Sequence, residues 1–242
     1  MNDVILRYFD CLGRAQPLRH ALIDAGVAFD DVRVPQAEWP QHKADKTFAG
    51  PFGGLPTLSF GGATVAETRP VASFLARRLG HYDGLEDAAI ARLEAISSNC
   101  YIEIMLRSGE LIYADYMYPG ADVGGALPGH MGRMLEKIGG VEALSPEGGW
   151  FGGARPVMAD FFAGEAVEVL RYMLGPAREE ALLSRLPRLS ALAARVRSRP
   201  ALAGAWQSRP ARFTSRPDEA EVVERLRAAD LSSVGFTSAR LV

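Results

Sequence analysis

The chain has 242 residues, of which 48% are hydrophobic and 23% charged, a composition typical of globular proteins of one or two domains. Its 27 basic and 29 acidic side chains give a formal net charge of −2, which disfavours binding to nucleic acid or to an anionic membrane surface. Two cysteines are too few for a disulfide framework, and the four histidines form no cluster with metal-ligand spacing. The first residues resemble no signal peptide and no apolar run is long enough to span a bilayer, so we expect a cytoplasmic protein without a metal.

The first eighty residues alternate between short apolar runs and helical patterns. These patterns predict, in chain order, a strand over 4–9, a helix over 16–25, a strand over 29–34, an irregular segment over 35–54, and strands over 55–60 and 63–66. The Gly61-Gly62 pair predicts a hairpin turn between the last two strands. Thr68 is the predicted N-cap of a further helix that ends at Gly80. The predicted order is therefore βαβ followed by ββα.

Beyond residue 86 the apolar side chains recur at three- and four-residue spacing, which predicts an all-helical region. The spacing predicts helices over 87–116, 125–143, 158–173 and 187–197. The glycine pairs in this region lack the context of a dinucleotide-binding loop and are interpreted as turns. The final segment, residues 207–242, contains one weakly helical stretch over 218–229, and its sequence fits either a packed or a partly ordered tail.

Several motifs carry a resemblance to one enzyme family. Tyr8-Phe9-x-x-x-Gly13-Arg14-Ala15 followed by Pro17-Leu18-Arg19 resembles the start of the tyrosine-type cytosolic glutathione transferases, nearest the sigma, mu and pi classes. Phe52-Gly53-Gly54-Leu55-Pro56 is similar to the family's FGxxP motif, whose proline is cis, and Glu67-Thr68 stands where the family has Gln-Ser or Glu-Ser. Ala159-Asp160-Phe161 resembles the family's helix-starting ADF element. The resemblance covers roughly residues 4 to 206.

The resemblance implies an α/β thioredoxin-like N-terminal domain that binds glutathione, an all-α C-terminal domain that binds the second substrate, and a homodimer. On this basis we expect domains over 1–81 and 87–206, followed by the tail over 207–242. The sequence departs from the family pattern by four extra residues between Lys43 and Phe52, and by Val157 in place of the usual Ser or Thr cap. The acidic residue that the family places on the partner subunit has no clear equivalent on the long helix.

Thiol transfer requires a thiolate, and a thiol with a pKa of about 8.5 is only about 3% ionised at pH 7. Tyr8 follows a buried strand beside a helix N-terminus, where its hydroxyl could donate to the sulfur and stabilise the anion. Arg14 would add a nearby positive charge. Tyr8 and Arg14 are therefore the expected catalytic residues, although Tyr8 could instead be a core aromatic residue. The glutathione-binding residues expected from the resemblance are Tyr8, Arg14, Trp39, Lys43, Gly54, Leu55, Pro56, Glu67 and Thr68.

The second substrate is expected to be a small apolar electrophile. Its pocket is expected to include Phe9, Cys11, Leu12, Tyr101, Met105 and Tyr113. Cys11 is a rival nucleophile, because it lies in the loop next to a helix N-terminus, a setting that lowers thiol pKa values. The sequence leaves three functions open: conjugation of glutathione, with a role in detoxification, a glutathione-dependent isomerase or lyase, and a non-catalytic binding protein of the same fold.

Overall fold

The computed structural model describes residues 3–120 and 122–236. The N-terminal part contains one four-stranded mixed sheet of order β2-β1-β3-β4. Its strands are β1 (Val4–Phe9), β2 (Asp30–Val34), β3 (Thr57–Phe60) and β4 (Ala63–Ala66). The β1 strand is parallel to β2 and antiparallel to β3. The carboxyl ends of β1 and β2 therefore lie at the same edge of the sheet.

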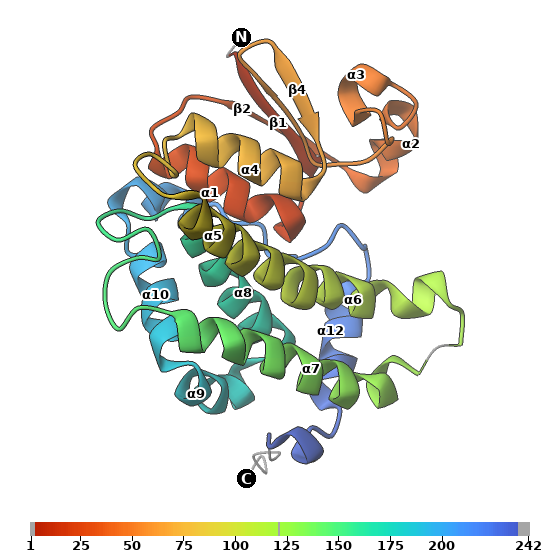
Figure 1. Cartoon of the computed structure of the whole chain (residues 1–242). Coiled ribbons are helices and arrows are strands. Elements are labelled where there is room, and N and C mark those ends of the chain that lie inside the picture. The colour runs from red at the N-terminus through yellow and green to blue at the C-terminus, as the bar shows by residue number, and fades with distance from the viewer. Residues whose placement is uncertain (1–2, 121, 237–242) are drawn as a thin grey trace.

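Two helices of the N-terminal part separate the sheet from the helical domain. The short helix η1 (Gly13–Ala15) leads into α1 (Gln16–Asp24), which lies beside α4 (Thr68–Arg78) on one face of the sheet (Figure 1). Buried Leu18, Leu22, Val71 and Leu75 cover the sheet and form the core between these layers. The end of β1 is thereby held next to the first turn of α1.

The expectation of an irregular segment over 35–54 was wrong in part. The segment contains η2 (Gln36–Glu38), α2 (Trp39–His42) and α3 (Lys46–Ala49), which lie at one side of the sheet (Figure 1). The carboxylate of Asp45 accepts hydrogen bonds from the N–H groups of Thr47 and Phe48 at 2.8 and 3.4 Å. This side-chain cap explains how so short a helix forms in a sequence without helical periodicity.

Thr68 is not the N-cap that the sequence predicted. Glu67 occupies the cap position with a φ of 72°, in the left-handed region that residues other than glycine rarely adopt, and Thr68 is the first helical residue. The turn at Glu67 carries the chain from β4 into α4, and the Glu67 N–H donates to the carbonyl of Pro56 at 3.2 Å. The N-terminus of α4 therefore lies against the segment before β3.

The second part of the chain is helical, as expected. Its elements up to residue 207 are α5 (Asp87–Asn99), η3 (Cys100–Leu106), α6 (Arg107–Met117), α7 (Val123–Leu144), α8 (Met158–Leu174), α9 (Pro176–Arg185), α10 (Pro187–Arg197), η4 (Pro200–Leu202) and α11 (Ala203–Gln207). The long helix expected over 87–116 is present, but its middle section, η3, is π-helical. The α9 helix was not predicted, because its apolar stripe is short: Arg178 and Leu182 are its buried residues.

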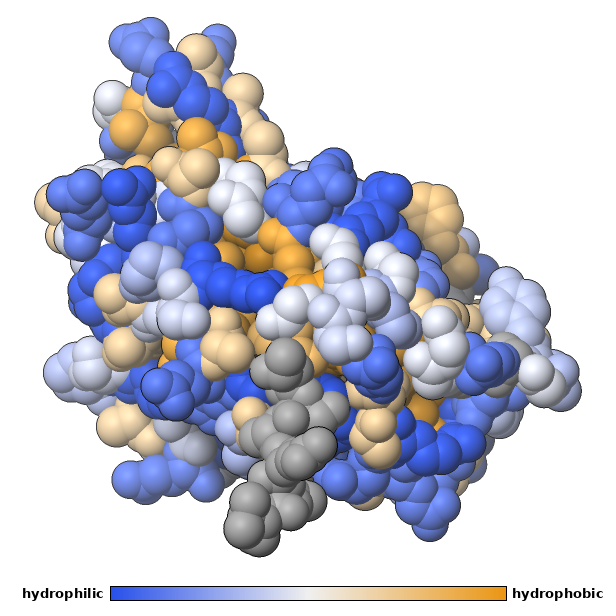
Figure 2. Space-filling model, turned by 90° about the horizontal axis from the view of Figure 1, so that it is seen from below, coloured by the Kyte–Doolittle hydropathy of each residue, from blue (hydrophilic) through white to orange (hydrophobic). Residues whose placement is uncertain are grey.

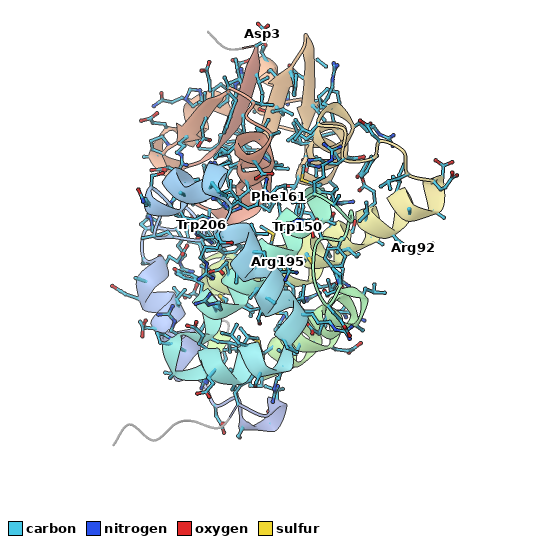
Figure 3. All side chains as sticks on the ribbon, turned by 90° about the vertical axis from the view of Figure 1, so that its left-hand side faces the viewer. Asp3, Arg92, Trp150, Phe161, Arg195 and Trp206 are labelled. Atoms are coloured by element: carbon cyan, nitrogen blue, oxygen red, sulfur yellow. The ribbon has the colours of Figure 1, made fainter. Side chains whose placement is uncertain are left out.

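Helix α8 is the centre of the helical domain, and nearly all of its side chains are buried. At its start the Asp160 carboxylate accepts hydrogen bonds from the N–H groups of Phe151 and Val157 at 2.9 and 2.8 Å. Val157 has no side-chain acceptor, so this carboxylate alone provides the cap. Phe161, in the first turn, points into the boundary between the two domains (Figure 3).

The described part of the tail packs against the protein as far as residue 236, while residues 237–242 lie outside the described residues. It contains α12 (Glu219–Ala228) and η5 (Ser232–Val234) and buries Phe213, Val222, Leu226 and Phe236.

The face of the molecule seen from below is mainly hydrophilic, with apolar surface in patches between the polar side chains (Figure 2). No helix in the described ranges is long and apolar enough to cross a membrane.

Candidate active site

Tyr8 lies near the end of β1 with only 5% of its surface exposed. Its hydroxyl oxygen accepts a hydrogen bond from the backbone N–H of Arg14 at 3.0 Å. Because that bond uses a lone pair of the oxygen, the hydroxyl proton remains free to donate to another atom. Burial raises the pKa of Tyr8 to about 12, so the phenol stays protonated at neutral pH. Tyr8 is thus a hydrogen-bond donor held in a fixed position.

The loop beside Tyr8 requires glycine at position 13. Gly13 has a φ of 41°, and a side-chain carbon built on it would lie 2.5 Å from the Tyr8 hydroxyl. The absence of that carbon lets the backbone turn around the phenol and present the Arg14 N–H to it.

Arg14 connects the loop to two other segments of the chain. Its Nη2 donates to the carbonyl oxygen of Leu55 at 2.7 Å, and its Nη1 lies 3.4 Å from the hydroxyl of Tyr101 on η3. The Leu55–Pro56 peptide bond is cis. A permanent positive charge is therefore fixed between the sheet and the long helix, close to the Tyr8 hydroxyl.

The start of α4 offers polar groups toward the same edge of the sheet. The Thr68 hydroxyl is buried and has no hydrogen-bond partner in the described part of the chain. The first backbone N–H groups of α4 have no acceptor within the helix, and they place a partial positive charge there. The Glu67 carboxylate lies near Gly54, where an added side-chain carbon would be 3.8 Å from Oε1. This end of the site can therefore bind a ligand that carries both a carboxylate and an ammonium group.

A cavity of about 380 Å³ opens beside Tyr8 and Arg14, between the sheet and the long helix. It is lined by aromatic, aliphatic and a few polar residues: Tyr8, Phe9, Cys11, Gly13, Arg14, Gln36, Trp39, Met105, Leu106, Gly109, Glu110, Tyr113, Met117, Phe213, Thr214 and Ser215. Phe9 and Trp39 pack edge to face with their ring centres 5.3 Å apart. The cavity can hold a small, mainly apolar molecule next to the phenol.

The tail forms one wall of this cavity. The N–H groups of Leu12 and Gly13 donate to the carbonyls of Arg212 and Phe213 at 3.0 and 2.8 Å. The Ser215 hydroxyl donates to Oε1 of Gln36 at 2.7 Å and lies 3.2 Å from the hydroxyl of Tyr113. The tail therefore joins the Tyr8 loop, the segment after β2 and helix α6.

Known proteins of one family are similar to this chain in sequence and in fold. A family model described as "Glutathione S-transferase, C-terminal domain" matches residues 126–209. The probable glutathione S-transferase 7 of Caenorhabditis elegans is 38% identical over 73 residues, which are 30% of this chain and 34% of that protein. The hematopoietic prostaglandin D synthase of Gallus gallus is 28% identical over 87% of this chain and 98% of its own length. A monomeric glutathione transferase structure from Necator americanus, 24% identical, has a TM-score of 0.70 over 86% of this chain and 97% of its own.

The chain is therefore similar to the glutathione transferases, in sequence over part of its length and in fold over most of it. The fold expected from the resemblance, a thioredoxin-like domain followed by a helical domain, is confirmed. The matched segment spans about a third of the length of the nematode relative. The same is true of a second relative from that species, probable glutathione S-transferase 5.

Most of the predicted pocket residues line the cavity. Phe9, Cys11, Met105 and Tyr113 do so, together with Trp39, which was predicted for glutathione binding. Leu12 and Tyr101 lie outside the lining.

The two exceptions have clear structural reasons. The buried Leu12 contacts the tail through its backbone, and the Tyr101 hydroxyl lies against Arg14. Lys43 is exposed after α2, beside Gly53 and outside the cavity lining.

Sequence reasoning missed the contribution of the tail and of several neighbouring residues. The missed lining residues are Gln36, Leu106, Gly109, Glu110, Met117, Phe213, Thr214 and Ser215. None of them belongs to a motif, and the tail residues are more than ninety positions from the α6 residues they approach. The only sequence signal was the predicted helix over 87–116, whose apolar spacing indicates a buried face but not which of these residues line the cavity.

Cys11 lines the cavity but lacks the properties of a nucleophile. It is 2% exposed, and burial raises the pKa of its thiol to about 12. The neighbouring Arg19 acts in the opposite direction but does not outweigh burial. The sulfur therefore stays protonated near neutral pH, which favours Tyr8 over Cys11 as the chemically active residue.

Proposed function

We propose that the protein is a glutathione transferase that conjugates the glutathione thiolate to a small apolar electrophile. The observation that carries this proposal is the Tyr8 hydroxyl, which accepts the Arg14 N–H and keeps its own proton available beside the cavity. A phenol donor lowers the thiol pKa by stabilising the anion, and a shift of about two units makes the thiolate the major species at pH 7. The thiol proton is lost to solvent and a sulfur lone pair forms the new bond to carbon. In a substitution the leaving group departs with its bonding electron pair, and in an addition the second carbon of the opened double bond takes up a proton from solvent.

Glutathione would lie along the edge formed by β3, α4 and the Tyr8 loop. Its γ-glutamyl carboxylate would receive the Thr68 hydroxyl and the free N–H groups of α4, and its ammonium group would pair with Glu67. The cysteinyl unit would pair with the backbone of Leu55 beside Gly54 and Pro56. Trp39 and Lys43 would lie nearest the glycine carboxylate, and Arg14 would hold its charge near the sulfur.

The second substrate would occupy the cavity between Phe9 and α6. A glutathione-dependent isomerase is the second candidate, because a full-length relative is named a prostaglandin D synthase. Both functions use the same thiolate and the same cavity. They differ in the fate of glutathione, which is consumed by conjugation and returned by an isomerase.

We also propose that the protein is a cytoplasmic homodimer with a role in detoxification. Phe52, 74% exposed on the N-terminal domain, is the apolar side chain that a second copy would cover. Sedimentation analysis is expected to give a dimer, and Phe52→Ser is expected to weaken it. A monomer at all concentrations would contradict this assembly, which would then resemble that of the Necator americanus structure.

The proposed activity is tested by retention on immobilised glutathione followed by turnover of an aryl halide. The parent is expected to bind and to form the conjugate. Tyr8→Phe is expected to bind but to turn over at least about tenfold more slowly, the ratio that about 1.4 kcal/mol of lost stabilisation produces. Unchanged turnover in Tyr8→Phe would overturn the role of Tyr8, and failure of the parent to bind glutathione would overturn the activity itself.

A further inference from the structure

Arg19 is an unusual residue for the position it occupies. It lies on α1, directly behind the Tyr8 loop, and only 2% of its surface is exposed. A buried cation is costly unless it is well paired, and an apolar residue of similar size often gives a more stable core. One of its nitrogens, Nη2, is buried without a partner among the described residues. Stability alone therefore gives a weak account of this arginine.

The remaining nitrogens of Arg19 hold the Tyr8 loop in place. Nη1 donates to the carbonyl oxygens of Cys11 at 2.9 Å and Leu12 at 3.5 Å, and to Oε1 of Gln16 at 3.3 Å. Nε donates to both oxygens of Asp31 on β2, at 3.0 and 3.2 Å. The guanidinium thus ties together β2, the start of α1 and the two residues that precede Gly13.

The same guanidinium also lies against the ring of Tyr8. Its Cζ is 5.8 Å from the ring centre, within the range of a cation–π contact. The positive charge faces the ring whose hydroxyl would donate to the thiolate. Through the loop, Arg19 also sets where Gly13 and the Arg14 N–H meet that hydroxyl.

We propose that Arg19 is a positioning residue that holds the Tyr8 phenol and its loop in the geometry that stabilises the glutathione thiolate. This inference rests on the proposed transferase function. A planar guanidinium can satisfy the two carbonyls and the carboxylate at once, whereas a lysine ammonium in the same place cannot reproduce that fork. The Arg19→Lys variant keeps the positive charge opposite Asp31 but loses the link to the loop.

Arg33 provides a matched control. Its Nε also donates to Asp31, at 2.8 Å, and its Nη1 lies 3.6 Å from Asp10. Among the described residues, its side chain makes no hydrogen bond to the carbonyls of residues 11 and 12 and no cation–π contact with the Tyr8 ring. Arg33→Lys therefore perturbs the same carboxylate without changing the proposed positioning contacts. If Arg19 only stabilised the fold through Asp31, the two lysine variants would behave alike.

The test is a titration of the glutathione thiol in the binary complex, followed by the ultraviolet absorbance of the thiolate, for the parent and the two lysine variants. We expect Arg19→Lys to raise the pKa of the bound thiol by about one unit and to move the rise of kcat/KM to higher pH, since a tenfold change in thiolate population equals one pH unit. Arg33→Lys is expected to keep the parent values.

The outcomes separate this inference from the proposed function. A parent that binds glutathione with a lowered thiol pKa, together with an Arg19→Lys variant that titrates like the parent, would overturn the role of Arg19 alone. A parent that does not bind glutathione would overturn both. Should Arg19→Lys fail to fold, Asp31→Asn serves as the second variant, because it leaves the guanidinium in place but removes its anchor on β2; a thiol pKa equal to the parent's would then contradict the proposal.

Discussion

The two halves of the candidate site differ in how far apart their residues lie in the sequence. The proposed glutathione half comes from the N-terminal domain and comprises Tyr8, Arg14, Leu55, Glu67 and Thr68. The proposed acceptor half comes from the helical domain and the tail and comprises Met105, Tyr113, Met117, Phe213, Thr214 and Ser215. The first is fixed by backbone turns and neighbouring strands, whereas the second depends on a tail that returns across the molecule. The comparison indicates that glutathione binding and acceptor choice can be changed separately.

The largest separate effect is expected at the anchor of the tail. Glu219 is fully buried, and its carboxylate accepts hydrogen bonds from the N–H groups of Phe213 and Thr214 and from the hydroxyl of Tyr172. Glu219→Gln would leave at least one of these donors without an acceptor, at a cost of about 1–3 kcal/mol.

We expect the KM for an apolar electrophile to rise by about tenfold in Glu219→Gln, with the Kd for glutathione changed less than about twofold. Steady-state kinetics and calorimetry measure the two quantities. Glu221→Gln, an exposed acid on the same helix, is the control. An equal loss of glutathione affinity would mean that the two halves are not separate.

A smaller effect is expected in the glutathione half, on the Kd for glutathione instead of the KM for the electrophile. Thr68→Val keeps the shape of the side chain but removes the buried hydroxyl that has no partner within the described residues. The Kd for glutathione is expected to rise about fivefold, because one hydrogen bond to a charged carboxylate is lost, while the KM for the electrophile stays at its parent value. The control is Thr64→Val, at an exposed position on β4. An unchanged Kd for glutathione in Thr68→Val would show that Thr68 does not bind glutathione.

A pH effect is expected where the tail meets α8. Glu165 is buried and pairs with Arg209 at 2.7 Å, yet burial dominates and raises its pKa to about 7. The folded protein therefore binds a proton more tightly than the unfolded chain, so this group's contribution to stability is full below about pH 4.5 and is lost as the pH rises through about 7.

Denaturant unfolding of Glu165→Gln and the parent at several pH values measures this contribution. As the pH rises from about 4.5 to about 7, the parent is expected to lose stability relative to Glu165→Gln, so its free energy of unfolding falls relative to that of the variant. Exposed Glu180→Gln should show no such trend. A pH-independent difference for Glu165→Gln would show that the carboxylate is ionised throughout, held by Arg209.

The smallest effect is expected for the cysteine in the cavity. Because burial keeps the Cys11 thiol protonated, Cys11→Ala is expected to change kcat with an aryl halide by less than about threefold. Cys100→Ala, a second buried thiol on η3, is the matched control. A loss of turnover in Cys11→Ala but not in Cys100→Ala would indicate that Cys11 takes part in the reaction.

The same contrast explains how much could be predicted from the sequence. Tyr8 and Arg14 are six positions apart, so one loop motif contained both partners of their hydrogen bond. The predicted order of strands and helices followed from local periodicity in the same way. The assignment of Thr68 as N-cap was wrong, because the left-handed turn at Glu67 leaves no pattern in the sequence.

The acceptor half could not be predicted to the same extent. The Ser215 hydroxyl contacts Gln36, which is 179 positions away, and Tyr113, which is 102 positions away. No periodicity or motif encodes a contact at that separation, since it results from the packing of the tail around buried Phe213 and Glu219. The position of the tail in the site therefore required the structure.

The central claim is that Tyr8 lowers the pKa of the glutathione thiol. The most direct measurement is a titration of that thiol in the binary complex of the parent and of Tyr8→Phe. The parent is expected to show a thiol pKa about two units below the ordinary value of about 8.5, and Tyr8→Phe is expected to return it to within about half a unit of that value. A lowered thiol pKa of equal size in both proteins would contradict the account.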